Sequence, residues 1–301
     1  LSALFVVTAN SWMNTPTGFR LVDGVVTDVD PLAAMLNPAA GAQVTHMIVA
    51  AYLVTGFCVA SFYAHRRLRG SSSTYHQRAV TLALLLAFPL VPVQMLVGDW
   101  SAKVVARSQP VKLAAMEGLY RTTKRAPLAI GGVPNETTRE LDFALEIPGG
   151  LSQLAYGDRD AEVQGLDAFP PDRRPPIVVV HLAFQVMVGI GGGMFLAAVW
   201  GGASLWLRRN WPQTRWFWWS VLLLGPLSIV AMEAGWVVTE VGRQPWIVQG
   251  YMKTADAVTQ APGVWTLLWV TIAVYLIIGL ATVVILRRLG QVPLPEETDG
   301  A

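Results

Sequence analysis

Long stretches without charged side chains alternate with polar connections along this chain. Four stretches contain no Asp, Glu, Lys or Arg, and they cover residues 31–65, 79–98, 175–207 and 257–286. A bilayer core about 30 Å thick needs about 20 apolar residues, because an α-helix rises about 1.5 Å per residue. Each stretch is long enough to cross a membrane, so each predicts one spanning helix.

Two further apolar stretches complete the pattern. Residues 216–240 are interrupted only by Glu233 before they close on Glu240, and residues 1–13 read as the last half of another helix. The pattern predicts an all-α polytopic membrane bundle with about five complete transmembrane helices and a partial first one. No charged segment precedes the apolar start, which therefore reads as a truncation and not as a signal peptide.

The expected organisation has three parts. Residues 1–98 hold the partial helix and two complete ones, and residues 175–301 hold three helices and a short cytoplasmic tail. Residues 99–174 are the only sizeable polar region, rich in Pro and Gly as well as charge. Because such a segment is too charged to enter lipid, we expect it to be a long, partly helical external loop.

Arginines mark one side of the expected membrane. Nine of them lie in three short connections that face the same side if the helices simply alternate: Arg66, Arg67, Arg69, Arg78, Arg208, Arg209, Arg215, Arg287 and Arg288. The positive-inside rule makes this side the cytoplasm and leaves residues 14–40, 99–174 and 241–262 outside. Five tryptophans between positions 206 and 219 are expected to anchor helix ends at the membrane interface.

Composition narrows the function classes. Only 14% of the residues are charged, against about 25% in soluble domains, which argues against both a disordered chain and an ordinary soluble enzyme. The net charge of +2 includes no polybasic tail, so nothing indicates a nucleic-acid partner. The single cysteine, Cys58, excludes an internal disulfide and a cysteine-rich metal site.

Two histidines and a methionine are candidate ligands within the predicted helices. His46 and His181 lie near the external ends of their helices, and Met187 follows His181 by about one and a half turns beside a glycine run. Imidazole and thioether groups on facing helices can form the axial pair of a haem iron, and glycines let a flat macrocycle approach. The residues alone do not choose between the histidines, and each also fits a packing role.

Two carboxylates and an indole share one face of the predicted helix over 216–240. At about 100° per residue, Glu233, Trp236 and Glu240 lie on the same side, and Arg243 follows at the helix end. Charged groups in a membrane avoid lipid, so this face is expected to look into the protein. It could ligate a metal, relay protons or simply hold a Glu240–Arg243 ion pair.

A short helix is also expected early in the polar region. The segment 109–118 begins with Gln109-Pro110 and places Lys112 and Glu117 about one and a half turns apart. Such a set at a membrane surface could hydrogen-bond the head group of a quinone. The alternative is a solvated helix face with no binding role.

Several motifs together resemble subunit I of the cytochrome bd-type quinol oxidases, which transfer electrons from membrane quinol to dioxygen. The most specific block contains Glu233-Ala234-Gly235-Trp236, Glu240 and Gly242-Arg243-Gln244-Pro245-Trp246. The supporting matches are Ala9-Asn10-Ser11-Trp12-Met13, Leu36-Asn37-Pro38 with His46, Gly98-Asp99, Lys112-Leu113-Ala114-Ala115-Met116-Glu117, and Phe184-Gln185-Val186-Met187.

The resemblance implies a set of cofactor sites. His46 and Met187 would be the axial ligands of a low-spin haem b, which favours His46 over His181 as the ligand. Glu240 would ligate a high-spin haem b next to haem d, or next to a third haem b. Trp236 and Arg243 would be haem neighbours.

The resemblance also implies a substrate site and partners. Lys112 and Glu117 would position the hydroxyls of ubiquinol or menaquinol for oxidation in the external loop, which corresponds to the family's Q-loop in its shorter form. Dioxygen, a subunit II and membrane lipids would be the partners, in the bacterial inner membrane. Quinol protons released outside and protons taken up inside for water would contribute to the proton motive force.

Two departures from the family pattern are visible. The chain is expected to begin inside the fourth of nine helices, so that alone it would be inactive, and Gln185 stands where some relatives have arginine. The competing hypothesis is a haem-free ion- or proton-coupled transporter that uses Glu233, Glu240 and Arg243.

Overall fold

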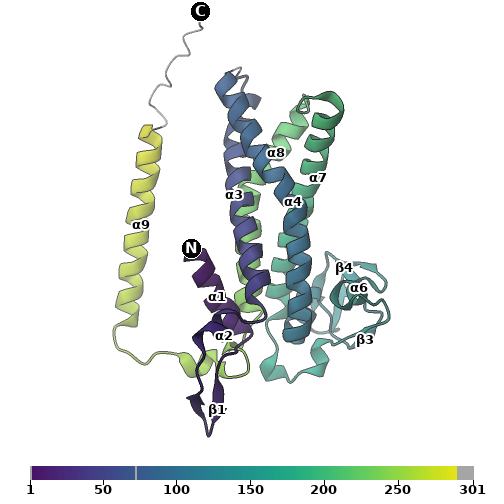
Figure 1. Cartoon of the computed structure of the whole chain (residues 1–301), viewed down its shortest axis with the longest axis vertical. Coiled ribbons are helices and arrows are strands. Elements are labelled where there is room, and N and C mark those ends of the chain that lie inside the picture. The colour runs from purple at the N-terminus through teal and green to yellow at the C-terminus, as the bar shows by residue number, and fades with distance from the viewer. Residues whose placement is uncertain (1, 72, 290–301) are drawn as a thin grey trace, which may run out of the picture. The chain divides into compact units, whose positions relative to one another are not determined.

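The computed structural model describes residues 2–71 and 73–289, which fall into two units, Leu1–Ala257 and Val258–Ala301. Five helices are long and apolar enough to cross a membrane. They are α3 (Ala40–Leu68), α4 (Thr74–Ser108), α7 (Ile177–Arg208) and α8 (Arg215–Val241) in the first unit and α9 (Val264–Leu289) in the second (Figure 1). The predicted spans and the polytopic all-α bundle are confirmed.

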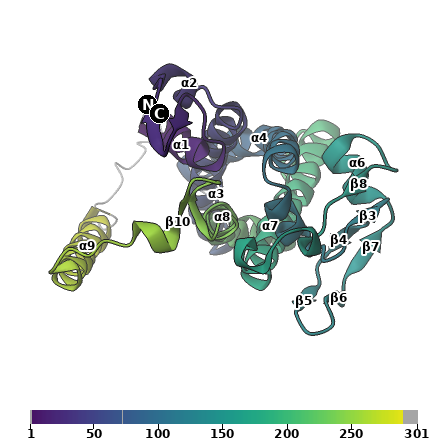
Figure 2. The same cartoon turned by 90° about the horizontal axis from the view of Figure 1, so that it is seen from below.

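Small residues bring the four helices of the first unit into close contact. α3 packs along both α4 and α8, and α7 packs along α8 (Figure 2). A Cβ at Gly56 would lie 2.9 Å from Ala87 Cβ, and one at Gly225 would lie 2.3 Å from Ser61 Cβ. Glycine at these crossings therefore lets the helix backbones approach, as is common between membrane helices.

The core of this unit is apolar, and so is much of its outer surface. Phe57, Leu84, Phe217 and Val221 are fully buried between the helices. Leucines such as Leu96 point outward from the same helices. A helix bundle with apolar residues both inside and outside matches a lipid environment, because hydrocarbon chains solvate the outer face.

Short elements fill the polar connections. α1 (Ser2–Asn14) forms the expected first helix, and α2 (Pro31–Met35), α5 (Pro110–Glu117) and α6 (Gly150–Tyr156) are further short helices. The described strands form two-stranded antiparallel pairs: β1 (Arg20–Val22) with β2 (Val25–Thr27), β3 (Thr123–Lys124) with β8 (Glu162–Val163), β4 (Leu128–Ile130) with β7 (Leu145–Ile147), β5 (Val133–Asn135) with β6 (Glu140–Asp142), and β9 (Trp246–Val248) with β10 (Met252–Lys253).

The first unit has two contrasting ends. At one, which we call the loop end, α1, α5 and the end of α8 meet, as shown by hydrogen bonds from Lys112 to Asn14 and to the Thr239 carbonyl. At the other, which we call the arginine end, lie the connections α3–α4 (residues 66–78) and α7–α8 (residues 208–215). The segments expected on opposite sides of the membrane thus lie at opposite ends of this unit.

The tryptophan expectation is only partly met. Trp206, Trp216 and Trp219 are exposed, as membrane-anchoring residues would be. Trp218, in contrast, is 2% exposed and packs against Phe217, so the anchoring interpretation is wrong for it. The period of the helix decides this, because positions 216 and 219 point outward and position 218 points inward.

Candidate functional site

The short helix α5 carries its polar residues into the protein. It begins at Pro110, a residue favoured in the first helical turn, and ends at Gly118 with φ +67°. All residues from 112 to 117 are buried, with Lys112 3% and Glu117 7% exposed. The alternative of a solvated helix face is therefore wrong, and both predicted quinol residues occupy buried positions.

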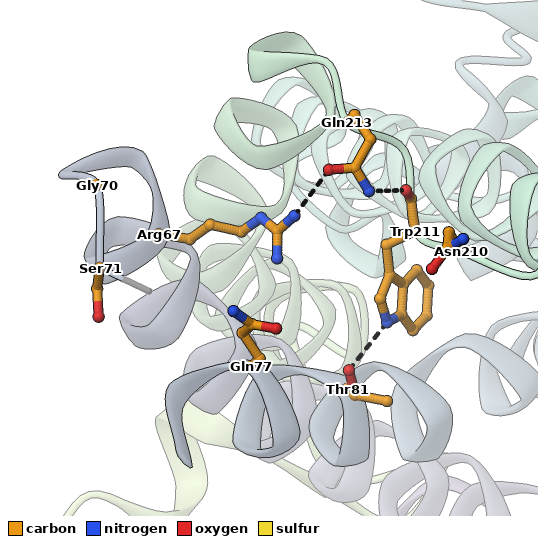
Figure 3. Close-up of a pocket in the computed structure, with 8 residues that line it drawn as sticks. All are labelled: Arg67, Gly70, Ser71, Gln77, Thr81, Asn210, Trp211 and Gln213. Atoms are coloured by element: carbon orange, nitrogen blue, oxygen red, sulfur yellow. Dashed lines mark hydrogen bonds between the residues drawn. The ribbon is translucent and has the colours of Figure 1, made fainter. Parts of the chain in front are cut away.

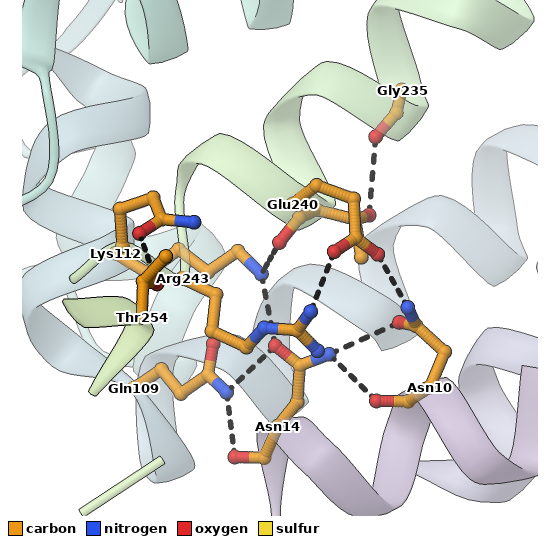
Figure 4. A network of polar contacts seen from close by, with 10 residues as sticks. Asn10, Asn14, Gln109, Lys112, Gly235, Glu240, Arg243 and Thr254 are labelled. Carbon is orange, nitrogen blue, oxygen red and sulfur yellow. Dashed lines mark hydrogen bonds and ion pairs between the residues drawn. The ribbon is translucent and has the colours of Figure 1, made fainter. Parts of the chain in front are cut away.

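Lys112 joins a polar network between α1, α5 and α8 (Figure 4). Its Nζ donates to the Thr239 carbonyl at 3.0 Å and to Asn14 Oδ1 at 3.3 Å. Gln109 Nε2 donates to the Asn14 carbonyl at 2.6 Å. The ammonium group is thus held by oxygen acceptors from two different helices.

Glu240 connects the same network to α1. One carboxylate oxygen accepts a hydrogen bond from Asn10 Nδ2, and the other forms an ion pair with Arg243 Nη2 at 2.5 Å. The predicted Glu240–Arg243 pair is present. Each oxygen keeps lone pairs beyond these contacts, so the carboxylate can still accept a further partner.

The Arg243 guanidinium is buried and incompletely satisfied. Its side chain is 6% exposed, and its Nε and Nη1 atoms have no hydrogen-bond partner among the described residues. Buried donors normally have partners, because an unmatched one costs about 1–3 kcal/mol. An anionic group such as a haem propionate would satisfy these donors.

Burial changes the protonation of both predicted quinol residues. Burial, together with the nearby positive charge of Arg243, lowers the pKa of Lys112 to about 7, and the charge of Glu240 opposes this shift. Burial raises the pKa of Glu117 to about 8. Glu117 Oε2 has no hydrogen-bond partner among the described residues. Near neutral pH, therefore, both Lys112 and Glu117 can gain or lose a proton.

His46 lies between α3 and α4 with unsatisfied polar atoms around it. Its Nε2 is 3.1 Å from the side-chain nitrogen of Gln94, while its Nδ1 and Gln94 Oε1 are buried without a partner in the described part of the chain. Gly98 leaves the ring edge uncovered, since a Cβ there would lie 3.6 Å from His46 Cε1. An imidazole in this setting fits the role of a haem ligand.

Met187 and His181 face different neighbours on α7. The Met187 sulfur packs against α8, 3.1 Å from where a Cβ of Gly235 would lie. His181 is fully buried, with Nδ1 2.9 Å from the Met116 carbonyl oxygen and Nε2 3.2 Å from the Gly131 carbonyl oxygen. Both ring nitrogens of His181 thus face backbone acceptors, whereas His46 retains a nitrogen without a partner.

The carboxylates of α8 do not share one environment. Glu233 is exposed and Trp236 is half-buried, whereas Glu240 is tied to Asn10 and Arg243. The expectation that Glu233 looks into the protein with Glu240 is wrong for this chain. Their seven-residue separation is nearly two turns, long enough for one carboxylate to reach a partner on α1 while the other does not.

Sequence reasoning gave no role in this network to Asn10 and Asn14, whereas Gln109 was named in the 109–118 segment. Asn14 Nδ2 donates to Asn10 Oδ1 at 3.2 Å, so the two amides bridge Lys112 and Glu240. Their four-residue spacing places them on one face of a helix, which was the available signal. In the described ranges, no group of three or more His, Cys, Asp or Glu side chains could hold a bare metal ion.

Comparison with known proteins gives a consistent result. The family model for cytochrome bd terminal oxidase subunit I matches residues 1–292. A putative cytochrome bd menaquinol oxidase subunit I from Bacillus subtilis (strain 168) is 35% identical, covering 100% of this chain and 69% of the relative. Cytochrome bd ubiquinol oxidase subunit 1 of the same strain is 30% identical, covering 96% and 64%.

A solved structure agrees with the sequence relatives. The bd oxidase from Geobacillus thermodenitrificans matches with a TM-score of 0.86 and 39% identity, over 97% of this chain and 67% of that chain. The chain thus spans about two thirds of the length of the proteins that it resembles. On its helices, its motifs and these matches, the chain belongs to the cytochrome bd terminal oxidase subunit I family, a family of terminal respiratory oxidases.

Proposed function

We propose that this chain is the quinol-oxidising, haem-bearing part of a bd-type respiratory oxidase. The observation that carries the proposal is the burial of Lys112 and Glu117 on α5, next to a network that contains Glu240 and Arg243. A solvated loop would not bury a lysine and a glutamate together, because isolated buried charges are costly. Such groups in a membrane protein are typical of proton-handling sites.

Glu117 is the proton acceptor in this proposal, and Lys112 is a positioning group. Quinol oxidation releases two protons and two electrons, so a base must lie near the quinol hydroxyl. The Glu117 carboxylate has an oxygen without a partner in the described structure and a pKa raised to about 8, which suits proton transfer near neutral pH. Lys112 would hold the second quinol oxygen or the network that faces it.

His46 and Met187 would hold a low-spin haem b between their helices. Haem bound there would accept the two electrons of quinol one at a time. The unsatisfied Nδ1 of His46 and the glycines beside both ligands support this assignment. Glu240 would ligate a high-spin haem b, Trp236 would line that site, and Arg243 would bind a propionate through its unsatisfied N–H groups.

The complete enzyme would place these sites in the bacterial inner membrane with the Q-loop outside. Its partners would be membrane quinol, dioxygen, a subunit II and a further oxygen-reducing haem, d or b. The arginine end would then face the cytoplasm, in line with the positive-inside rule. Protons from quinol would leave at the loop end.

Two variants of the assembled oxidase test this function. Glu117→Gln should lower quinol oxidation by about 100-fold while the reduced-minus-oxidised haem b spectrum is unchanged. Glu146→Gln, at an exposed position of β7 in the same loop, is the control and should keep full activity. Loss of haem in Glu117→Gln would instead assign Glu117 a structural role.

The haem ligand is tested separately. His46→Ala should remove the low-spin haem b signal, whereas His65→Ala, at an exposed position of the same helix, should retain it. An unchanged spectrum in His46→Ala would refute the ligand. Complete absence of haem from the parent oxidase would favour the transporter hypothesis.

A further inference from the structure

A pocket of about 610 Å³ opens at the arginine end, between the α3–α4 and α7–α8 connections (Figure 3). It is lined by Arg67, Gly70, Ser71, Gln77, Thr81, Asn210, Trp211 and Gln213. An adjoining pocket of about 300 Å³ adds Arg215 and Trp218. Cationic, amide and hydroxyl side chains therefore surround this space, with indole rings on one side.

The segments that line this pocket contain no carboxylate that could neutralise its positive charge. Neither residues 31–98 nor residues 173–232 contain Asp or Glu, and every pocket residue comes from these two ranges. Seven arginines lie in the two connections: Arg66, Arg67, Arg69, Arg78, Arg208, Arg209 and Arg215. Within the described ranges, no ion pair involves any of the seven.

Arg67 is held ready for a ligand. Its guanidinium carbon lies 4.4 Å from the centroid of the Trp218 ring, and its Nη2 donates to Gln213 Oε1 at 3.1 Å. Trp218 is itself fixed by a hydrogen bond from Nε1 to the Pro212 carbonyl at 3.0 Å. A guanidinium has five N–H donors, and this hydrogen bond uses one of them, so a fork remains for an anion.

The frame around Arg67 joins both connections. Gln213 Nε2 donates to the Trp211 carbonyl at 2.8 Å, and Trp211 Nε1 donates to Thr81 Oγ1 at 3.0 Å. The polar wall thus spans α4 and the α7–α8 connection without any contribution from acidic groups. A preorganised cationic site of this kind binds an anionic phosphate group better than it binds a neutral ligand.

The position of the pocket indicates the source of the phosphate. Exposed apolar side chains surround this end of the bundle, among them Phe62, Leu207 and Trp216. They would contact acyl chains while the head group entered the pocket, and basic pockets between membrane helices are known to bind anionic lipid head groups. We propose that this pocket binds the phosphodiester head group of an anionic phospholipid, with the Arg67 guanidinium as its main partner.

The test uses the assembled oxidase in vesicles of phosphatidylcholine with added phosphatidylglycerol. Retention of phosphatidylglycerol after purification, measured by mass spectrometry, should fall about tenfold in Arg67→Gln. Arg69→Gln, at an exposed position outside the pocket lining, should retain the lipid. An equal loss of lipid in both variants would overturn the proposal that the lipid binds in this pocket, and would indicate general attraction to the basic surface.

Two further arms keep the outcome decisive. Arg67→Lys retains the charge but loses the fork, so it should give an intermediate loss that a folding defect would not produce. Millimolar inorganic phosphate should not displace the lipid, and full displacement would show that the pocket takes a soluble anion instead. The residues proposed to hold haem are not part of this pocket, so the haem content of each variant reports whether it is folded.

A separate observation concerns α7 and the Q-loop, and this second inference rests on the proposed function. Gln185 Oε1 accepts from the Gly131 backbone N–H at 3.0 Å, and its Nε2 donates to the Ala129 carbonyl at 3.2 Å. His181, one turn earlier on the same face, faces the Gly131 and Met116 carbonyls. α7 therefore holds β4 and its following turn together with the residue that precedes Glu117.

The opposite side of α7 presents Met187 to α8. Met187 follows Gln185 by two residues, about 200° around the helix, and packs against Gly235. The same two turns thus contact the quinol segment on one side and carry the expected haem ligand on the other. We infer that Gln185 and His181 are positioning residues that fix the quinol site relative to the low-spin haem.

Kinetics with the potential of haem b test this inference. Gln185→Leu should raise the KM for quinol about tenfold, because two hydrogen bonds to the loop are lost, while kcat changes less than about twofold. If α7 couples the two sites, a quinol-site inhibitor should shift the haem b potential in the parent, and Gln185→Leu should abolish that shift. Gln153→Leu, exposed on α6 in the same loop, is the control.

The outcomes separate this inference from the proposed function. An unchanged KM and an unchanged inhibitor-linked shift in Gln185→Leu would overturn the positioning role and leave quinol oxidation intact. Failure of the parent oxidase to bind haem or oxidise quinol would overturn the proposed function itself. Rescue by Gln185→Glu, which keeps the acceptor for the Gly131 N–H but loses the donor to Ala129, should be partial.

Discussion

The two ends of the first unit handle charge in opposite ways. At the loop end, Lys112 and Arg243 are buried, two asparagine side chains link Lys112 to Glu240, and Glu240 pairs with Arg243. At the arginine end, the cations lie in acid-free connections and have no protein carboxylate among the described residues. Buried charges need partners from the protein, whereas charges at a membrane surface can use lipid phosphates and water.

The charges at the two ends of the unit therefore serve different roles. In the topology that we propose, positive charge at the arginine end sets the orientation and needs no fixed geometry, apart from the Arg67 pocket. Charge at the loop end is held at hydrogen-bonding distance across three helices, as the proton-handling site that we propose would require. The following predictions test this contrast.

Breaking the network should have the largest effect. Glu240→Gln leaves the buried Arg243 charge without its ion-pair partner, and we expect a loss of about 3 kcal/mol in the free energy of unfolding. Glu233→Gln removes a charge at an exposed position of the same helix and should change it by less than about 0.5 kcal/mol. Thermal unfolding in detergent compares the two. Equal effects would contradict the contrast between a carboxylate paired with a buried arginine and an unpaired, exposed one.

The backbone beside Glu117 should be almost as sensitive. Gly118 has φ +67°, and a Cβ there would lie 2.9 Å from Leu141 Cδ1 and 3.2 Å from His181 Nδ1. Gly118→Ala should therefore cost about 2–3 kcal/mol and raise the KM for quinol.

Gly157→Ala is the matched control for that change. Gly157 has φ +75° but nothing within 4 Å of the added methyl group, so its substitution should cost only about 1 kcal/mol of backbone strain. The difference between the melting temperatures of the two variants measures how closely His181 and Leu141 approach residue 118. If the two alanine variants have the same melting temperature, the contacts with His181 and Leu141 do not add to the cost of Gly118→Ala.

The pH dependence of quinol oxidation should report Glu117. Its pKa is raised to about 8, so below that pH the fraction of proton-accepting carboxylate rises about tenfold per pH unit. We expect kcat/KM to rise toward pH 8 and then level off. Glu117→Gln should remove this limb and Glu146→Gln should keep it. A flat profile in the parent would exclude Glu117 as the base.

The arginine end should give the smallest effect. Arg69→Gln changes an exposed side chain that has no ion pair in the described structure, and we expect less than about 0.5 kcal/mol in detergent. The same measurement on Arg243→Gln, at the loop end, should show a clearly larger loss. Similar losses would mean that both ends treat arginine alike.

Much of the fold could be predicted from the sequence. Uncharged stretches of 20 or more residues have one stable solution in a bilayer, because every backbone polar group must be satisfied within the helix. The start of α5 could also be predicted, since Pro110 favours the first turn of a helix. These features depend on neighbouring residues alone.

The environment of each site residue could not be predicted in this way. Whether Lys112 and Glu117 face water depends on how α1, α7 and α8 cover α5, and α1, α7 and α8 are distant from α5 in sequence. The spacing that placed Glu233 beside Glu240 was correct for an isolated helix but could not show that only Glu240 meets Asn10. The short strand pairs of the polar region likewise carried no clear period.

The sequence by itself determined the membrane helices, the concentration of arginine at one end and the residues of the family motifs, because composition and local period suffice for these. Only the tertiary structure decided that both His181 nitrogens face backbone carbonyls, that Arg243 keeps unsatisfied donors and that Trp218 supports Arg67. The physical reason is that burial and hydrogen bonding are properties of pairs of segments, and those pairs form only when distant parts of the chain meet.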